Sequence, residues 1–317
     1  MRTCCAVGHD LRHKHNSLRF TLPIMIAVLI SAIGGIQLQC GIPDEDRIIF
    51  ASTRDGDSEI YMINHDGSGL SQLTFNSVED SGPAGAPGGE RFLYLSRLGE
   101  GETYEIMIGF YDSGRVHIQL TSDFYDEQNA SWSPGGNKIC FCRNVNGRSD
   151  IWVMDDRGEN QEPITTNPGS DRQPEWSPGG DWIVYISDSP FDENGSPQIC
   201  IIRSDGTEKT QLTSSATVKS DPSWSPDGST IYYIEQLDED QHFALKSVNR
   251  SAGEDAVITT FRERVVKPYM SRDNNVIVYS IAGKGTRSEL YLYDLISGQE
   301  IRLTDNSYPD TSPRWTR

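Results

Sequence analysis

The sequence predicts an all-β protein, a six-bladed β-propeller built from four-stranded antiparallel blades. Short β-rich segments recur with a period near 46 residues, Gly, Pro and Asp separate them, and no segment after residue 40 has helical periodicity. One propeller blade has about this length. We therefore expect residues 41–317 to form the propeller and residues 1–40 to form a separate N-terminal segment.

The N-terminal segment has the layout of a signal peptide or a membrane anchor. Seventeen residues from Phe20 to Ile36 carry no charge, and a basic stretch precedes them. A cleaved signal, a retained anchor and a lipoprotein signal acylated at Cys40 all remain open. Each alternative predicts that residues 41–317 are periplasmic or otherwise extracytoplasmic, and two of them predict attachment to the membrane.

Two sequence columns set the repeat. One is a Trp-Ser-Pro turn at Trp132, Trp176 and Trp224, with degenerate copies at Gly85 and Met270 and a truncated copy at the C-terminus. The other is an aliphatic residue followed by Thr, at Leu73-Thr74, Leu120-Thr121, Ile164-Thr165, Leu212-Thr213, Ile258-Thr259 and Leu303-Thr304. Each period supplies four strands, A to D, which in the fourth repeat we expect at residues 174–177, 182–187, 198–203 and 210–213.

The two ends of the repeat array complement each other. Residues 47–74 supply strands B, C and D without a preceding strand A, whereas the segment from Pro313 supplies a strand A with nothing after it. Together they make one blade. We therefore expect the C-terminal strand to close the ring, because closure removes the unpaired edges of an open array.

These signals, WSPDG, an aliphatic-aromatic strand C, a DG turn and LT, resemble the repeat of the TolB family. That family is a WD-repeat-like β-propeller module of bacterial periplasmic proteins. The resemblance implies a propeller that binds a protein partner at the cell envelope. TolB itself carries an α/β domain before its propeller, and we expect this chain to lack that domain.

The repeated tryptophans and the cysteines are predicted to be structural. The tryptophans recur at one blade position, which favours packing between neighbouring blades over a ligand site. Cys140 and Cys142 lie two residues apart in a predicted strand and face the same side of it. A bridge between them would strain the strand, so we expect buried free thiols.

The chain is acidic, with 46 Asp and Glu residues, 28 Lys and Arg residues and a formal net charge of −18. Residues 41–317 hold 45 of the acids and 24 of the bases, so the predicted propeller has a net charge of −21. Affinity for nucleic acid depends on cationic side chains that neutralise phosphates. The composition therefore argues against a nucleic acid partner.

Two columns of acids fall on the face that carries the B–C and D–A loops. The first column opens the C strands, and the second lies three residues before the Pro position of the A strands. The predicted binding residues are Glu59, Glu105, Asp150 and Glu289 in the first column and Asp80, Glu127, Asp171 and Asp310 in the second. The second set is expected to surround the mouth of the central channel, where Ca²⁺ is the cation that clustered carboxylates suit.

The acidic columns are interrupted in the later blades. Gln198 and Phe243 break the first column, and Lys219 and Val265 break the second, while nearby bases make this sector more basic: Arg262, Arg264 and Lys267. An alternative role for the acids is also open, because Asp and Glu in loops often accept hydrogen bonds from their own loop.

The residues favour a binding protein over an enzyme. The three histidines after residue 40, His65, His117 and His242, belong to different repeats, and no GxSxG motif is present. We predict a monomeric, non-catalytic scaffold without a cofactor that binds a protein at the bacterial envelope through its loop-rich face. A carboxylate-based glycosidase or lyase and a carbohydrate-binding propeller remain alternatives, because paired acids occur on that face.

Overall fold

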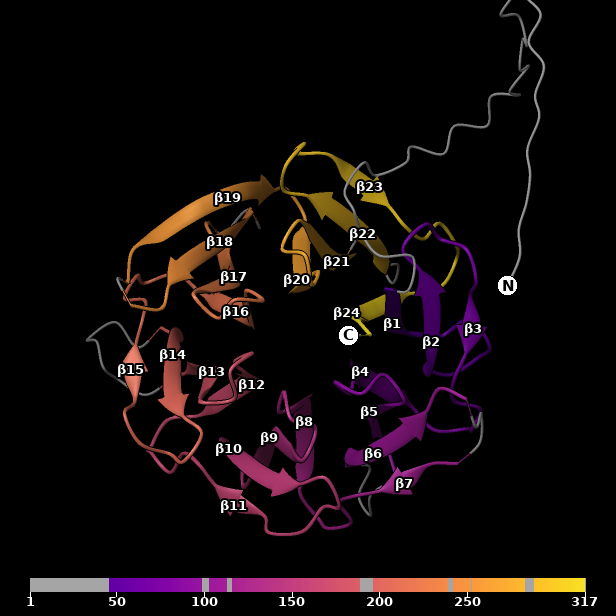
Figure 1. Ribbon diagram of the computed structural model, residues 1–317, viewed down its shortest axis with the longest axis horizontal. Helices are drawn as coiled ribbons and strands as arrows, with labels where there is room; N and C mark the ends of the chain where they lie inside the picture. Colours follow the sequence, from indigo (N-terminus) through magenta and orange to yellow (C-terminus); the bar gives the residue numbers. More distant parts are fainter. Residues whose placement is uncertain are drawn as a thin grey trace, which may run out of the picture. The chain divides into compact units, whose positions relative to one another are not determined.

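The computed structural model describes residues 46–98, 103–112, 116–188, 196–238, 242–251, 253–282 and 288–316. Within these ranges the chain forms 24 β-strands in six four-stranded sheets, arranged as blades around a central axis (Figure 1). All strand pairs within the blades are antiparallel. The all-β, six-bladed prediction is confirmed.

The strands follow one order in every blade, from the innermost strand A to the outermost strand D. Blade 1 contains β24 (Asp310–Trp315), β1 (Arg47–Ser52), β2 (Glu59–Asn64) and β3 (Ser71–Gln72). Blade 2 contains β4 (Asp80–Gly85), β5 (Arg91–Ser96), β6 (Glu105–Phe110) and β7 (Ile118–Gln119). Blade 3 contains β8 (Asp126–Trp132), β9 (Lys138–Val145), β10 (Arg148–Asp155) and β11 (Glu162–Pro163).

The remaining blades repeat this order. Blade 4 contains β12 (Asp171–Trp176), β13 (Trp182–Ser187), β14 (Gln198–Arg203) and β15 (Thr210–Gln211). Blade 5 contains β16 (Lys219–Trp224), β17 (Thr230–Gln236), β18 (Phe243–Asn249) and β19 (Asp255–Phe261). Blade 6 contains β20 (Arg264–Met270), β21 (Val276–Ala282), β22 (Ser288–Asp294) and β23 (Glu300–Arg302).

Ring closure occurs in blade 1, as the sequence predicts. Strand β24 pairs with β1 through Trp315 opposite Ile48 and Asp310 opposite Ser52. The described residues contain no helix long and apolar enough to cross a bilayer. The expected signal or anchor in residues 1–40, including Cys40, lies outside the described residues.

Every pairing of strands A and B contains a β-bulge at the same place. One residue in each bulge has a φ of 52° to 56°, in the left-handed region that residues other than Gly rarely adopt: Gly82, Asn129, Gln173, Asp221, Lys267 and Ser312. These residues belong to the innermost strands. The bulge is thus a feature of the repeat. In blade 4 strand A is predicted to begin at Pro174, whereas β12 begins at Asp171, before the bulge.

The core consists of apolar layers between adjacent blades. Trp132 of blade 3, for example, is 6% exposed and packs in a cluster with Leu93 and Ile106 of blade 2. Trp176, Trp224 and Trp315 lie in equivalent clusters and are 5% to 7% exposed. Inter-blade packing of the repeated tryptophans is confirmed.

The cysteine prediction is also confirmed for the described residues. Cys140 and Cys142 are free and buried against blade 4, in one cluster with the free Cys200. Burial raises the pKa of the Cys142 thiol to about 12. These thiols therefore act as small apolar groups in the core.

The D strands show where the repeat is interrupted. In five blades strand D has two or three residues, and a link of six or seven residues then leads to the next strand A. In blade 5 strand β19 has seven residues, and only Arg262 and Glu263 separate it from β20. Strand β19 thus continues past Thr259 of the aliphatic-Thr column, and its pairing with β18 extends to Phe261.

Substitution of Trp315 tests the closing contact. Its side chain packs against residues of blades 1 and 6, and its indole Nε1 donates to the Tyr269 carbonyl oxygen at 3.1 Å. We expect Trp315→Ala to lower the free energy of unfolding by about 3–5 kcal/mol. Chemical denaturation measures this loss. Ile296→Ala is the control, because Ile296 is 74% exposed, and equal losses in the two variants would contradict the closing role.

Candidate functional site

The B–C and D–A loops emerge on one face of the propeller, which we call the loop face, because successive strands alternate in direction. Its D–A loops are residues 73–79, 120–125, 164–170, 212–218, 262–263 and 303–309. The opposite face, which carries the A–B and C–D turns, is called the turn face. All eight acids predicted as binding residues lie within the first three residues of strands that begin at the loop face.

The acids of the first column are buried near a threonine that follows strand D. The Thr304 hydroxyl donates to Oε2 of Glu289 at 2.6 Å and accepts the Leu290 backbone N–H at 3.0 Å. Glu59 accepts from Thr74 in the same way. In both blades the threonine hydroxyl, instead of a backbone carbonyl of strand D, accepts the backbone N–H of strand C. The backbone pairing of strands C and D therefore ends at this threonine. We call this arrangement the threonine cap.

The cap does not require a carboxylate. In blade 4, Thr213 donates to the amide oxygen of Gln198 at 2.9 Å and accepts the Ile199 N–H at 3.0 Å. An amide that accepts the hydroxyl proton thus serves as well as an acid. The break in the acidic column at Gln198 therefore leaves the structural arrangement intact.

In blades 1 and 6 an asparagine joins the two acidic columns. The Asn76 backbone N–H donates to Oε1 of Glu59 at 2.7 Å, and its side-chain amide donates to Oδ2 of Asp80 at 2.7 Å. Asn306 makes the matching bonds to Glu289, at 3.1 Å, and to Asp310, at 2.7 Å. These bonds hold the start of each D–A loop against the ends of strands C and A.

The acids of the second column are fully buried, with 0% exposure for Asp80, Glu127, Asp171 and Asp310. Their carboxylates accept hydrogen bonds from strand B of their own blade. The Ser96 and Ser187 hydroxyls donate to Asp80 and Asp171 at 2.5 Å and 2.6 Å. These acids lie at the start of the innermost strands as expected, but their carboxylates bond to neighbouring groups of the propeller: to strand B of the same blade and, for Asp80 and Asp310, to the asparagine of the preceding D–A loop.

Arginines also bind the acids of the second column. Arg143 takes the place of the serine opposite Glu127 and donates to its Oε1 at 2.8 Å. In blade 1 Ser52 stays opposite Asp310, and Arg54, just after β1, donates to Asp310 at 2.8 Å. In blade 5 the charges are exchanged, because Lys219 stands opposite Glu235. In blade 6 the pair is Val265 and Ile281, which needs no hydrogen bond.

Burial changes the acidity of several of these carboxyl groups. It raises the pKa of Glu59 to about 7, an effect that the hydrogen bonds from Thr74 and Asn76 oppose and that the charge of Asp80 reinforces. Burial raises the pKa of Glu127 to about 8, and Arg143 opposes this shift. Burial also raises the pKa of Glu105 and of Asp150, where Arg148 forms an ion pair at 2.8 Å.

The binding role predicted for these eight acids stays a prediction. Each has at most 6% of its surface exposed, which leaves little carboxylate surface for a partner in this conformation. What their contacts support is a positioning role, in which buried acids fix the loops of the loop face. The loops, and the side chains that they expose, then become the part of the site that faces solvent.

One acidic group in the described residues has ligand atoms close enough for a cation. Oxygens of Asp55, Asp57 and Glu59, in the B–C loop of blade 1, lie within 4.8 Å of one another. Glu59 is already engaged by Thr74 and Asn76, and Asp55 accepts a hydrogen bond from Gln72. The Ca²⁺ prediction for the acidic face thus remains a prediction.

The aromatic side chains of the D–A loops were not predicted as site residues. Phe75, Phe124, Tyr125 and Tyr308 are 56%, 76%, 41% and 45% exposed. They come from three consecutive loops, those that join blades 6 to 1, 1 to 2 and 2 to 3. We call them the aromatic rim. The sequence signal for them is an aromatic residue one to four positions after the threonine in these three loops.

The central channel is narrow near the bulges and wider toward the turn face. Gln173 donates to Asp221 at 3.0 Å, and Lys267 lies 3.7 Å from the same carboxylate, so side chains of three blades meet around a cavity of about 10 Å³. A cavity of about 600 Å³ lies beside the repeated Trp-Ser-Pro turns and is lined by residues that include Trp132, Trp176, Trp224 and Trp315.

The repeat unit matches a known family. The model of the TolB beta propeller domain matches residues 128–287. The chain belongs to the TolB beta-propeller family. A TolB homolog of Chlorobium luteolum is 30% identical over 149 residues, which cover 44% of this chain and 31% of that protein. The match therefore spans about a third of the curated relative.

Solved structures share the fold at lower identity. TolB from Acinetobacter baumannii is 20% identical, with a TM-score of 0.73, and the match covers 87% of this chain and 68% of that one. An oligogalacturonate lyase from Vibrio parahaemolyticus is 14% identical, with a TM-score of 0.59 and coverage of 82% and 74%. At these identities the likeness shows the propeller fold alone, which binding proteins and enzymes share.

Removal of one threonine cap tests the positioning role. We expect Thr304→Val, which keeps the shape of the side chain, to lower the free energy of unfolding by about 1–3 kcal/mol, because Glu289 and the Leu290 N–H lose their partner. Chemical denaturation measures the loss. Thr259→Val is the matched control, since Thr259 lies within β19 and forms no cap. A larger effect in the control would contradict the assignment.

The raised pKa of Glu59 predicts a pH-dependent stability. Because its folded pKa, about 7, exceeds its ordinary value of 4.5, the folded state binds the proton more tightly. The stabilisation is complete below the ordinary value and is lost as the pH rises through about 7. We expect the melting temperature to fall between about pH 5 and pH 8, and Glu59→Gln to flatten this fall. Equal slopes in the variant and the wild type would contradict it.

Proposed function

We propose that this propeller is a non-catalytic scaffold that binds a protein partner at the bacterial cell envelope through its loop face. The observation that carries the proposal is the aromatic rim. Exposed aromatic side chains are enriched at protein interfaces because they bury a large area at low cost in conformational entropy. Four of them, on three neighbouring loops, supply the centre of a docking surface.

The distribution of exposed apolar residues supports this choice of face. Leu98, Val218 and Leu237 also lie on loop-face segments and are 47%, 52% and 42% exposed. On the turn face, large exposed apolar side chains among the described residues are fewer, with Ile296 in a C–D turn as the most exposed. Apolar surface gathered on one face favours a protein partner.

Charge adds to the partner's description. Asp305, next to Tyr308 in the same loop, is 82% exposed in its side chain, and Glu79 beside the rim is 48% exposed. Both acids contact arginines of the propeller but remain open to solvent. A partner that places apolar and basic side chains together therefore matches the rim.

The family and the N-terminal sequence both support the proposed location. Membership of the TolB propeller family supports an extracytoplasmic role with a protein partner. The uncharged segment from Phe20 to Ile36 supports export, with acylation at Cys40 or a retained anchor as routes to membrane attachment. The partner is expected to be an envelope protein, and the propeller is expected to act as a monomer.

The acids support a non-catalytic role. A glycosidase needs two carboxyl groups that reach the substrate, one as acid and one as base or nucleophile. Here the repeated carboxylates are buried within their blades, with at most 6% of each residue exposed, so they are not open to a substrate. The lyase that shares the fold is too distant in sequence to transfer its activity.

A charge placed on the rim tests the proposal. We expect Phe124→Asp to reduce capture of the partner from envelope extracts by at least about tenfold, since loss of a buried aromatic anchor costs 2 kcal/mol or more. The melting temperature is expected to stay unchanged, because the side chain is 76% exposed.

Ile296→Asp is the matched control, because it places the same charge on an equally exposed residue of the turn face. Quantitative cross-linking to the tagged propeller measures capture for both variants. If the two variants lose capture equally, or if neither loses it, the rim is not the docking surface.

A further inference from the structure

The loop face has a second feature at blades 5 and 6, where the repeat departs from its pattern. The threonine cap is absent from blade 5, and Phe243 takes the place of the acid or, in blade 4, the glutamine near the start of strand C in the other blades. Strand β19 pairs with β18 up to Phe243, opposite Phe261, and the link to β20 is two residues long. The six or seven residues that cover this position in the other blades are therefore missing.

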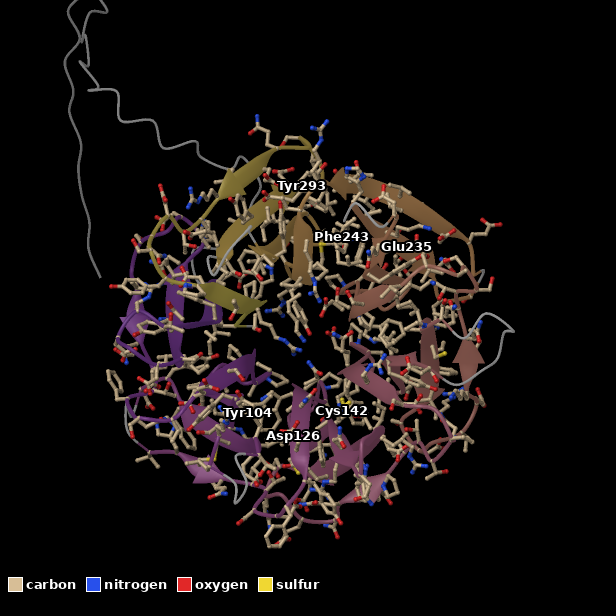
Figure 2. All side chains as sticks on the ribbon, turned by 180° about the vertical axis from the view of Figure 1, so that it is seen from behind. Tyr104, Asp126, Cys142, Glu235, Phe243 and Tyr293 are labelled. Atoms are coloured by element: carbon tan, nitrogen blue, oxygen red, sulfur yellow. The ribbon has the colours of Figure 1, made fainter. Side chains whose placement is uncertain are left out.

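An open pocket lies where that cover is missing. Its volume is about 260 Å³, and its lining consists of Val218, Ser220, Ile234, Gln236, Phe243 and Arg264. These residues come from the link before β16, from three strands of blade 5 and from the first residue of β20. Figure 2 labels Phe243 and Glu235 in this sector of the ring. We call it the blade 5 pocket.

The size and lining of the blade 5 pocket fit one large apolar side chain. Pockets for drug-sized molecules start near 300 Å³, so this one is slightly smaller. Ile234 and Phe243 are 2% and 7% exposed and form an apolar floor, and Val218 is exposed at the edge. A protein interface commonly inserts an anchor side chain into a pocket of this kind.

Two exposed arginines, Arg262 and Arg264, stand at the edge of the pocket, with the exposed Glu263 between them in the sequence. Arg264 lines the pocket and Arg262 stands two residues before it, and neither forms an ion pair within the described part of the chain. Elsewhere on the loop face, by contrast, Arg97, Arg143 and Arg302 are paired with acids. Glu235, the buried acid of blade 5, is already neutralised by Lys246 at 2.8 Å.

We propose that the blade 5 pocket receives a large apolar side chain of the protein partner that is followed directly by a carboxylate, which pairs with Arg264. The inference rests on the proposed function, since it names part of the partner that the loop face binds. An apolar anchor fills the pocket, and the guanidinium forms a charge-assisted hydrogen bond with the carboxylate beside it. The pocket thereby determines the orientation of the partner on the loop face.

Capped tetrapeptides test the proposal on the whole propeller. The probe is acetyl-Ala-Phe-Asp-Ala-amide, and the comparison peptides replace its Asp by Lys or its Phe by Ser. We expect saturable NMR shifts of the Val218 and Gln236 amides with the Phe-Asp peptide, and affinity lower by about tenfold for each comparison peptide.

Two variants locate the binding. Arg264→Glu is expected to reverse the preference, so that the Phe-Lys peptide binds more tightly than the Phe-Asp peptide. Val218→Trp is expected to fill the pocket and abolish binding, whereas Ile296→Trp, on the turn face, leaves it unchanged. Both substituted residues of the pocket are exposed, so the fold is expected to tolerate the changes. Amide spectra of each variant report its fold.

The outcomes separate this inference from the proposed function. If the Phe-Asp peptide does not saturate, or if Arg264→Glu leaves the peptide preference unchanged, the anchor pocket is overturned. When Phe124→Asp nevertheless reduces partner capture, the scaffold function stands without it. If the peptide preference reverses as expected while Phe124→Asp leaves capture intact, the pocket stands and the rim does not.

Discussion

The arrangement of the loop face depends on one hydrogen-bonded group, the threonine cap. Its hydroxyl accepts a backbone N–H of strand C and donates to a side chain near the start of that strand, so it ends the ladder between strands C and D. A chain freed from the ladder turns inward and becomes a D–A loop. Where the cap is absent, in blade 5, the ladder continues and the loop shrinks to two residues. The cap thus decides how much of each blade the loops cover.

The sequence predicted the fold because its repeats carry redundant signals. Trp182 and Gln198 mark the starts of strands B and C in blade 4, and the structure places them there. Closure through β24 was predictable for the same reason, since a strand was missing at one end and left over at the other. Because the pattern occurs six times, a strand that is ambiguous in one repeat can be assigned from the same position in the others.

The site was harder to predict, because the same residue types have different roles when they are buried. Asp171 sits where the sequence places it, at the start of an innermost strand, but its carboxylate bonds to Ser187 inside the blade. A one-dimensional pattern does not say which neighbour a side chain meets. For Phe124 the sequence did not show that the side chain is exposed. An apolar residue in a loop can be buried or exposed, and only the structure shows that Phe124 is 76% exposed.

The closing strand has a consequence for how the chain reaches its final form. Arg54, just after β1, pairs with Asp310 in β24 across 256 residues of sequence. Contacts between residues so far apart in sequence form late in folding, because the entropic cost of closing a long loop precedes the stabilisation that the contact provides. A growing polypeptide therefore holds five complete blades next to an unfinished one, whose exposed edge must wait for its last strand. Until then blade 1 is the place where aggregation or a chaperone competes with folding.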